Sequence, residues 1–437
     1  MPGEWAEMSD VLKVAIAGLG TVGAETMRVL RDNADLLAAR AGRPIQVVAV
    51  SARDRAKDRG VDLDGVAWHD NAAELAGRDD VDIVTELIGG SEGIAKDLVE
   101  AALGSGKSVV TANKALVAHH GAALGALAEA NGVTLAYESA VAGGIPIIKT
   151  MREGLSANRI ERVYGILNGT CNYILTVMRE TGRPFADVLA DAQELGYAEA
   201  DPAFDIDGVD AAHKLAILSS IAFGTTVDFD SIDIEGIRHI SPVDLEYAQE
   251  LGYRIKLLGI AEQTEAGVQQ RVKPCMVPIT AQIAQVDGVF NAVAAQGSSV
   301  GETLSYGRGA GAGPTASAVI ADLVDIAAGR NVPVFGIPGA ALSAPRAAGI
   351  EALSGSYYIR LMVIDRPGVL ADLTAVFRDE KVSVEALIQS GRDPGEIVPV
   401  VLTTHETEDA AIRRSVAKIA DLEAVTEEPR VLRIEAI

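Results

Sequence analysis

The chain has 437 residues, a length that at ~150 residues per domain predicts about three domains and excludes a single small module. Hydrophobic residues make up 49% and charged residues 23%, a composition typical of globular proteins and not of disordered or collagen-like ones. There are 38 Lys and Arg against 61 Asp and Glu, and the net charge of −23 would repel nucleic acid and anionic membranes. We therefore expect neither as a partner.

Cysteine use and the absence of targeting signals predict a cytoplasmic protein. Two cysteines, Cys171 and Cys275, are too few for a disulfide framework, so a reducing compartment is favoured. No basic and apolar leader opens the chain, and no apolar run approaches the ~20 residues of a membrane span. Residues before Val11 lack a structural pattern, and Met8 is an alternative to Met1 as the natural start.

The first part of the chain alternates short apolar runs with amphipathic stretches, a pattern typical of βαβ units on a parallel sheet. The expected strands are Lys13–Gly18, Ile45–Ser51, Ile83–Leu87, Ser108–Thr111 and Thr134–Glu138. The expected helices are Val22–Ala39, Ala95–Leu103 and Lys114–Ala130. This α/β pattern predicts a Rossmann-like, doubly wound nucleotide domain over residues 11–142.

The pattern changes after Gly143-Gly144-Ile145-Pro146 to mixed helix and strand. Apolar alternation is clear at Ile160–Ile166 and looser at Val268–Pro278, which predicts an α+β domain over 143–306. A glycine-rich stretch at 306–315 then leads into an apolar helix expected over Ala316–Ala327. We expect residues 307–345 to return to the nucleotide domain and complete it.

The last part of the chain, residues 355–437, follows a boundary near Pro345 to Ser356. Its expected elements are strand Tyr357–Ile364, helix Gly368–Glu380, strands Ser383–Gln389 and Ile397–Thr404, helix Asp409–Asp421 and strand Val431–Ile434. The order βαββαβ predicts a ferredoxin-like domain.

A glycine motif lies between the first predicted strand and helix. Gly18, Gly20 and Gly23 form Gly-x-Gly-x-x-Gly, with Thr21 and Val22 inside it. This position supplies a tight turn, a close backbone approach to a pyrophosphate and the dipole of a helix N-terminus together. The motif therefore predicts a dinucleotide cofactor.

The residues after the second predicted strand bear on the choice between NADP and NAD. An acidic residue that binds the ribose diol would indicate NAD, but Arg53 and Lys57 lie here and suit a 2′-phosphate. Solvated surface charges are the alternative for both, and Asp54 leaves room for NAD. We predict NADP, with NAD as the alternative.

Two lysines are candidates for proton chemistry. Lys114 follows the strand predicted over 108–111, whose carboxyl end should face the ligand crevice, although a lysine can equally open an ordinary surface helix. Asp210 and Lys214 share one helix face at i and i+4. An exposed pair would contribute only ~0.3 to 0.5 kcal/mol, whereas in a cleft it becomes a proton donor with its orienting carboxylate. Asp205 or Asp207 can cap this helix.

Together these motifs resemble homoserine dehydrogenase from Val11 to Ile437. The stretches that carry the resemblance are Gly18 to Gly23, Glu86-Leu87-Ile88-Gly89-Gly90, Thr111 to Leu116, Tyr137 to Ile147, Gly165 to Thr170, Gly196 to Leu218 and Gly307 to Ser317. A generic Rossmann enzyme would share the first of them and few others. The resemblance implies reversible NAD(P)-dependent reduction of L-aspartate 4-semialdehyde to L-homoserine, on the route to threonine, methionine and isoleucine.

The same resemblance assigns roles to individual residues. It implies that Lys214 is the proton donor to the nascent alkoxide, Lys114 a second cation at the reacting oxygen and Asp210 a substrate-binding acid. Glu199 would take the substrate's ammonium, with Asp205 supporting the site. An aldehyde that accepts hydride develops negative charge on oxygen, which two ammonium groups stabilise.

Further expectations follow from the family. Lys114, Gly196 and Gly311 would add cofactor contacts. A monovalent cation, in our expectation Na⁺, would bind carbonyl oxygens of Glu138, Val141, Gly143 and Ile145. The carboxy-terminal unit resembles an ACT domain, which implies an amino-acid effector, usually threonine. The family also implies a homodimer or homotetramer, with the central domain serving catalysis and dimerisation.

Two rival functions remain at this point. A catalytically silent amino-acid sensor would keep the folds, but the presence of both Lys114 and Lys214 argues against it. Aspartate-semialdehyde dehydrogenase needs a cysteine nucleophile, for which Cys171 would require a low thiol pKa and a nearby cation. The sequence favours Cys171 as buried apolar filler instead.

Overall fold

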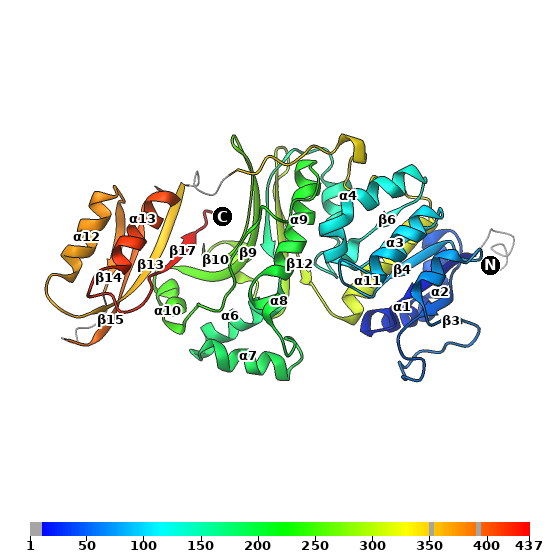
Figure 1. Cartoon of the computed structure of the whole chain (residues 1–437), viewed down its shortest axis with the longest axis horizontal. Helices are drawn as coiled ribbons and strands as arrows, with labels where there is room; N and C mark the ends of the chain where they lie inside the picture. The colour runs from blue at the N-terminus through cyan, green and yellow to red at the C-terminus, as the bar shows by residue number, and fades with distance from the viewer. Residues whose placement is uncertain (1–10, 349–353, 390–394) are drawn as a thin grey trace.

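The computed structural model describes residues 11–348, 354–389 and 395–437, and the alternative starts at Met1 and Met8 lie outside these ranges. Figure 1 shows three parts in a row: the amino-terminal part in blue and cyan, a largely green central part, and the orange and red carboxy-terminal part. Within the described residues, no helix has the length and apolar character needed to cross a bilayer.

The first sheet is parallel throughout, in the order β3-β2-β1-β4-β5-β6. Its strands are β1 (Leu12–Ala17), β2 (Ile45–Ser51), β3 (Ala67–His69), β4 (Ile83–Glu86), β5 (Ser108–Thr111) and β6 (Leu135–Ala136). Its helices are α1 (Thr21–Asp32), α2 (Ala34–Ala41), α3 (Ile94–Gly104) and α4 (Lys114–Ala130). The chain builds outward from β1 first to β2 and β3 and then to β4, so the carboxyl ends of β1 and β4 form the switch point where such sheets bind ligands.

A helix from much later in the chain covers this sheet. α11 (Ala312–Ala327) packs against α1 and buries Val319 and Leu323 in the apolar cluster that contains Val14 and Ile16 of β1. The glycine-rich stretch that precedes α11 thus lies at the border between the first sheet and the central part.

A mixed sheet runs through the central and carboxy-terminal parts in the order β12-β11-β7-β9-β10-β17-β13-β15-β14. Its central strands are β7 (Ile160–Ile166), β9 (Tyr253–Thr264), β10 (Gly267–Pro278), β11 (Phe290–Gly297) and β12 (Gly301–Arg308), with β8 (Asp233–Ile234) beside β10. The central helices are α6 (Gly169–Thr181), α7 (Phe185–Glu194), α8 (Ala203–Ile206), α9 (Val209–Phe223) and α10 (Pro242–Glu250). α9 packs on β7, β9 and β10, so its buried face is fixed against the sheet.

Short elements connect these parts. They are η1 (Ala72–Gly77), η2 (Glu138–Ala140), α5 (Ile147–Lys149), η3 (Thr150–Gly154), η4 (Gln282–Gln285) and η5 (Gly339–Ala341).

The carboxy-terminal part has the predicted ferredoxin-like order. Its elements are β13 (Ser354–Ile364), α12 (Val369–Asp379), β14 (Val384–Ile388), β15 (Ile397–Thr404), β16 (Thr407–Glu408), α13 (Asp409–Ala420) and β17 (Arg430–Ile434). The strands lie in the order β17-β13-β15-β14 and pair antiparallel. The predicted α/β fold class, with a Rossmann-like sheet, a mixed-sheet central part and a βαββαβ unit, is confirmed.

Several predicted elements differ in extent from the structure: α11 begins at Ala312 and not at the expected Ala316, β13 begins at Ser354 and not at Tyr357, and the short strand β3 was not predicted. The helix predicted over Val22–Ala39 is two helices, because Asn33 leaves the helical conformation with φ −112° and ψ 20°. Asparagine side chains compete for backbone hydrogen bonds and so favour helix ends. The strand predicted over Thr134–Glu138 ends with β6, because the backbone N–H of Glu138 donates to Asp322 Oδ2 at 2.9 Å and the chain turns into η2.

Candidate active site

A cavity of about 540 Å³ lies where the carboxyl edge of the parallel sheet meets the central part. Its lining combines Val22 and Lys114 of the first part with Asn168, Asp210 and Lys214 of the central part. The segment 308–311, which leads into α11, closes another side. A dinucleotide bound at the switch point and a small substrate bound by the central part would therefore meet in this cavity.

The glycine motif has the close contacts that its spacing predicts. Gly18 has φ +103°, and a Cβ there would lie 2.5 Å from Leu87 O, while a Cβ on Gly23 would lie 2.0 Å from Gly18 O. A Cβ on Gly20 would meet nothing within 4 Å. Among the described residues, no side chain caps the N-terminus of α1 at Thr21. The turn therefore fits a pyrophosphate, with free space over Gly20 and an uncapped helix end.

Glu86 fixes the backbone on the other side of the switch point, a role that the sequence analysis did not assign. Its fully buried carboxylate accepts the N–H groups of Ile88 at 2.7 Å and Gly89 at 2.9 Å, and the hydroxyl of Thr111 at 2.6 Å. The carboxylate thus ties the loop after β4 to the end of β5. The sequence feature that could have indicated this role is an acidic residue at the end of a strand expected to be buried.

Lys114 and Lys214 meet at one carboxylate. Lys114 is the first residue of α4, and Lys214 lies one helical turn after Asp210 on α9. Lys214 Nζ is 2.7 Å from Asp210 Oδ2, and Lys114 Nζ is 3.1 Å from Oδ1. The side chains of Asp210 and Lys214 are only 6% and 10% exposed, which excludes the exposed-pair alternative.

Asn168 connects the acidic residues of the site. Its Nδ2 donates to Asp205 Oδ1 at 2.9 Å and to Asp210 Oδ2 at 2.8 Å, while its Oδ1 accepts the N–H of Cys171 as the N-cap of α6. The preceding carbonyl, that of Leu167, accepts Lys214 Nζ at 2.7 Å. No role was predicted for Asn168, although asparagine is one of the residue types that most often cap helices.

The capping role predicted for Asp205 or Asp207 is wrong. α9 begins after Gly208, which has φ 87°, and no side chain caps it. A Cβ on this residue would lie 3.2 Å from side chains of β8 and β10, so the left-handed turn packs directly on the sheet. The turn leaves Asp205 lining the cavity, and Asp207 is ion-paired with Arg238.

The surrounding charges keep Asp210 ionised. Burial alone would raise the pKa of Asp210, but the ammonium groups of Lys214 and Lys114 and the hydrogen bond from Asn168 outweigh it and hold that pKa well below its usual range. For Asp205, burial and the neighbouring charge of Asp210 raise the pKa. The environment thus separates two neighbouring carboxyl groups in acidity, as in sites where such groups have different roles in proton chemistry.

A stack of aromatic rings lies next to Lys114. Phe204 and Phe229 both stack on His213, with ring centroids 5.6 Å and 4.4 Å from it. Lys114 Nζ lies 5.4 Å from the Phe204 ring. Burial and the neighbouring His119 lower the pKa of His213 to about 4, so this histidine is neutral at neutral pH. None of these aromatic residues was predicted, since each lies in a different segment.

The basic residues predicted for NADP lie on the surface after β2. Arg53 and Lys57 are both exposed. A third basic residue, Arg59, was not predicted: its Nε donates to Leu19 O inside the glycine motif at 2.9 Å, and its Nη2 donates to Asp54 O at 2.5 Å. Arg59 therefore fastens the basic loop to the glycine turn.

Of the remaining residues predicted to contact the cofactor or the substrate, two line the cavity and one does not. Gly196 and Gly311 line the cavity, with φ +73° and +114°. Glu199 is exposed and is not a lining residue, although Tyr197, two residues before it, is.

The segment predicted to hold a cation forms part of the cavity wall, where Ala142 and Gly143 are lining residues. Ala142 has φ 53° and Gly143 has φ 26°, so the backbone reverses within the loop. Hydrogen bonds in the described part of the chain leave the carbonyls of Val141 and Gly143 without a donor. No cluster of three His, Cys, Asp or Glu side chains that could hold a metal occurs among the described residues. The residues present fit a cation held by backbone oxygens.

Cys171 is not an activated nucleophile. It is fully buried, its backbone carries the cap of α6, and burial raises its thiol pKa well above the ordinary value. A thiolate nucleophile needs the opposite environment. The prediction of buried filler is confirmed.

Known proteins match this chain over almost its whole length. The family model described as homoserine dehydrogenase matches residues 146–324, its NAD-binding domain matches 18–138, and the ACT domain matches 357–421. The homoserine dehydrogenase of Neisseria gonorrhoeae is 46% identical over 98% of this chain and 99% of its own length. This chain belongs to the homoserine dehydrogenase family. A solved homoserine dehydrogenase from Thiobacillus denitrificans has a TM-score of 0.92 and 47% identity, covering 98% of both chains.

Membership in the homoserine dehydrogenase family establishes the activity. The protein is an NAD(P)-dependent oxidoreductase of amino-acid biosynthesis that interconverts L-aspartate 4-semialdehyde and L-homoserine. A more distant relative, a hyperthermophilic archaeal homoserine dehydrogenase in complex with NADPH, has a TM-score of 0.63 and 26% identity, covering 72% of this chain and 97% of its own. The two rival functions, a silent sensor and a cysteine-dependent dehydrogenase, are set aside by the family and by Cys171.

Proposed function

We propose that Lys214 donates the proton to the substrate oxygen during reduction of the aldehyde, with Lys114 as a second cation at that oxygen. The observation that carries this assignment is the convergence of both ammonium groups on the two oxygens of Asp210 at the cavity wall. When bound, the nicotinamide cofactor supplies the hydride that reaches the aldehyde carbon. As the carbonyl oxygen becomes an alkoxide, the ammonium groups stabilise its charge and one of them protonates it.

In this proposal, acidic residues bind the amino-acid end of the substrate. Asp210 orients the lysines and contacts the substrate, and Asp205 supports it through the shared Asn168 amide. Glu199 takes the substrate's ammonium. Its place two residues after the lining residue Tyr197 supports this role.

Substitution of Lys214 tests this mechanism. Lys214→Ala should lower kcat by ~10² or more while dinucleotide affinity holds, because general acid catalysis is typically worth ~10² to 10⁴. Turnover is followed by nicotinamide absorbance, and affinity by fluorescence titration with the reduced cofactor. Lys418→Ala, at an exposed lysine of α13, is the control and should behave as wild type. Near-normal turnover of Lys214→Ala would remove this residue from its role.

We propose NADP as the preferred cofactor, with NAD as the alternative. The exposed Arg53 and Lys57 lie beside the turn that contains Gly18, whose N–H donates to Ser51 O at 2.8 Å at the end of β2. A 2′-phosphate on the ribose would meet this basic loop. The archaeal relative in complex with NADPH supports the same choice. The glycine motif, Gly196 and Gly311 would hold the remainder of the dinucleotide.

The bound cation and the assembly are further parts of the proposal. A monovalent ion, Na⁺ in our proposal, would take carbonyl oxygens of Glu138, Val141, Gly143 and Ile145, and the two carbonyls without donors support it.

For the assembly we propose a homodimer or homotetramer through the central part. β12 is an edge strand of the mixed sheet with Tyr306 56% exposed, and an uncovered edge of this length favours pairing with another copy.

Regulation, location and domain limits complete the proposal. We assign threonine as effector of the ACT domain, supported by a cavity of about 270 Å³ at the turn between β13 and α12. A cytoplasmic location is supported by two free cysteines, as expected in a reducing compartment. The proposed domains are 11–142 completed by 307–345, 143–306, and 355–437.

A further inference from the structure

Asn291, the second residue of β11, places a buried amide in the wall of the active-site cavity. Its side chain is only 2% exposed. Within the described residues, neither Oδ1 nor Nδ2 of this amide has a hydrogen-bond partner. Because buried polar side chains nearly always have one, this exception requires an explanation.

Asn291 differs in this respect from the other buried asparagines of the described chain. Asn113 and Asn168 each accept a backbone N–H and donate to a second group. Asn172, also 2% exposed, donates to three backbone carbonyls and accepts from Lys256 Nζ at 3.1 Å. The fold therefore satisfies these amides by itself, whereas the amide of Asn291 is available to a ligand of the cavity.

Two glycines leave room for this amide. A Cβ on Gly309, in the segment that closes the cavity, would lie 2.2 Å from Asn291 Cγ and 2.4 Å from its Nδ2. On the other side, a Cβ on Gly169, the first residue of α6, would lie 3.4 Å from Asn291 Oδ1. Any side chain at position 309 would displace the amide, so its place in the wall depends on this glycine.

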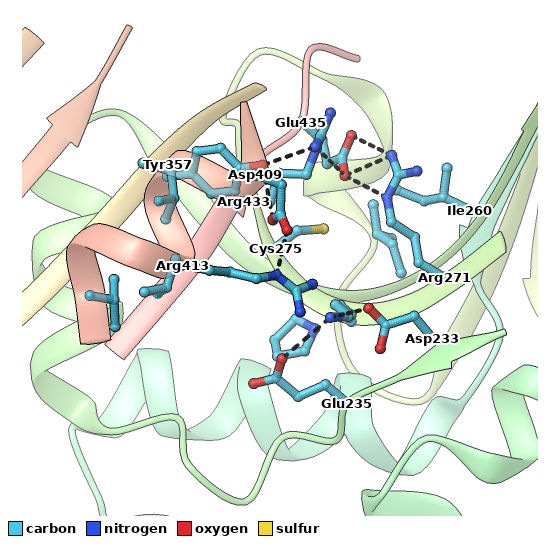
Figure 2. Close-up of a pocket in the computed structure, with 16 residues that line it drawn as sticks. Asp233, Glu235, Ile260, Arg271, Cys275, Tyr357, Asp409, Arg413, Arg433 and Glu435 are labelled. Carbon is cyan, nitrogen blue, oxygen red and sulfur yellow. Dashed lines mark hydrogen bonds and ion pairs between the residues drawn. The ribbon is translucent and has the colours of Figure 1, made fainter. Parts of the chain in front are cut away.

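The charged groups of the cavity between the central and carboxy-terminal parts provide a contrast. There, Arg271 Nη2 donates to Glu435 Oε1 at 3.0 Å, and Lys273 is ion-paired with Asp233 (Figure 2). These groups have their partners within the protein. The amide of Asn291 instead faces the cavity in which cofactor and substrate would meet.

The chemistry of an amide selects the ligand group. Asn291 offers a donor at Nδ2 and an acceptor at Oδ1, and both need a partner. The carboxylate of the substrate only accepts, and its ammonium only donates and is assigned to Glu199. The carboxamide of the nicotinamide ring carries an acceptor and a donor on one planar group. We propose that Asn291 binds this carboxamide through two hydrogen bonds and thereby orients the ring.

The place of Asn291 in the site supports this partner. The carboxamide is attached to the ring carbon next to the one that carries the hydride, so it must lie close to the reacting oxygen. Gly169, beside the amide, directly follows Asn168, whose Nδ2 donates at 2.8 Å to the Asp210 carboxylate that pairs with both lysines. This inference rests on the proposed binding of the dinucleotide in this cavity, and it is independent of which lysine donates the proton.

Calorimetric titration of the full chain tests the proposal. The probes are NADP⁺, its 3-acetylpyridine analogue, in which a methyl group replaces the carboxamide nitrogen, and 2′-phospho-ADP-ribose, which lacks the ring. Wild type should bind NADP⁺ about fivefold or more tightly than the analogue, because the analogue leaves Asn291 Oδ1 without a donor. In Asn291→Ala the two dinucleotides should bind within about twofold of each other, and 2′-phospho-ADP-ribose should bind as in wild type.

Two results of these titrations would overturn the proposal. One is an unchanged preference for NADP⁺ over the analogue in Asn291→Ala, and the other is an equal loss of affinity for 2′-phospho-ADP-ribose. Asn131→Ala, at the exposed carboxyl end of α4, is the control and should bind all three probes as wild type. If the chain prefers NAD, the same series with NAD⁺, its 3-acetylpyridine analogue and ADP-ribose separates failure of the cofactor preference from failure of this inference.

Thermal unfolding without ligand tests a purely structural role. Because the amide of Asn291 has no partner in the described chain, Asn291→Ala should unfold at the wild-type temperature or above it. Asn172→Ala is the equally buried match and should unfold several degrees lower, because it leaves backbone carbonyls without their donor. A destabilisation of Asn291→Ala as large as that of Asn172→Ala would show that the amide supports the fold, against the proposal.

Titration with L-homoserine distinguishes the two ligands of the cavity. With the chain saturated by 2′-phospho-ADP-ribose, wild type and Asn291→Ala should bind L-homoserine equally. Weaker homoserine binding in the variant, with its preference for NADP⁺ over the analogue retained, would place the amide at the substrate and overturn the assignment. Failure of Lys214→Ala to lower kcat would bear on proton transfer alone.

Discussion

The substitution Asp210→Asn tests the electrostatic design of the active site. Asparagine keeps the shape of the side chain and its place on α9 but removes the charge that lies 2.7 Å from Lys214 Nζ and 3.1 Å from Lys114 Nζ. Two ammonium groups would then share a poorly solvated site without their common counter-charge. The protonated form of Lys214, which the proposed mechanism requires, becomes less favourable.

The expected size follows from the burial of the pair. Removing one partner of a buried ion pair costs about 3 to 5 kcal/mol. Lys214 is 10% exposed and keeps its hydrogen bond to Leu167 O, so we take about 3 kcal/mol, the lower limit. At about 1.36 kcal/mol for each pH unit, a loss of this size corresponds to about two pH units in the pH dependence of turnover.

The assay is the pH dependence of semialdehyde reduction. The alkaline limb of kcat should move down by about two pH units in Asp210→Asn, because it reports loss of the donor's proton in the bound complex. Asp207→Asn is the matched control, since Asp207 lies on the same turn but is 40% exposed and pairs with Arg238. An alkaline limb at the same pH in both variants, with both folded by circular dichroism, would refute the claim that Asp210 keeps Lys214 protonated.

Three further predictions concern the cofactor and stability. Arg53→Ala should weaken NADPH about tenfold or more relative to NADH in fluorescence titrations, and equal losses would contradict the 2′-phosphate assignment. Gly23→Ala should abolish dinucleotide binding, because its Cβ would lie 2.0 Å from a backbone carbonyl of the turn, whereas Gly104→Ala, in open space, should bind normally. For His213, whose pKa is lowered from 6.5 to about 4, the unfolded chain takes up its proton first as the pH falls through this range. The free energy of unfolding should therefore fall by up to about 3 kcal/mol. Urea titrations across this pH range should show this loss in wild type and in His239→Gln, an exposed control, but not in His213→Gln. An equal fall of the unfolding free energy with pH in all three proteins would contradict the prediction.

Local sequence patterns were sufficient for most elements of the fold. Alternation and helical periodicity depend on neighbouring residues, so five of the six strands of the parallel sheet and the whole βαββαβ unit could be predicted within a few residues, whereas the short strand β3 was not predicted. One error in extent arose where a distant partner decided, and another where a local signal was overlooked. The strand predicted over Thr134–Glu138 ends early because Asp322, from α11, takes the N–H of Glu138. The helix predicted over Val22–Ala39 divides at Asn33, where a local signal was present and not used.

In the candidate site, too, some features depend on neighbouring residues and others on distant partners. By itself the sequence determined the glycine turn and the Asp210–Lys214 pair, because each depends on residues a few positions apart. Only the tertiary structure decided that Lys114 reaches the same carboxylate, that Asn168 bridges Asp205 to it, and that Phe204 stacks on His213. The physical reason is that hydrogen bonds and ion pairs act over a few ångströms in space. Which distant segments come that close is set by the packing of α4 against α9 and of α6 and α9 against the mixed sheet.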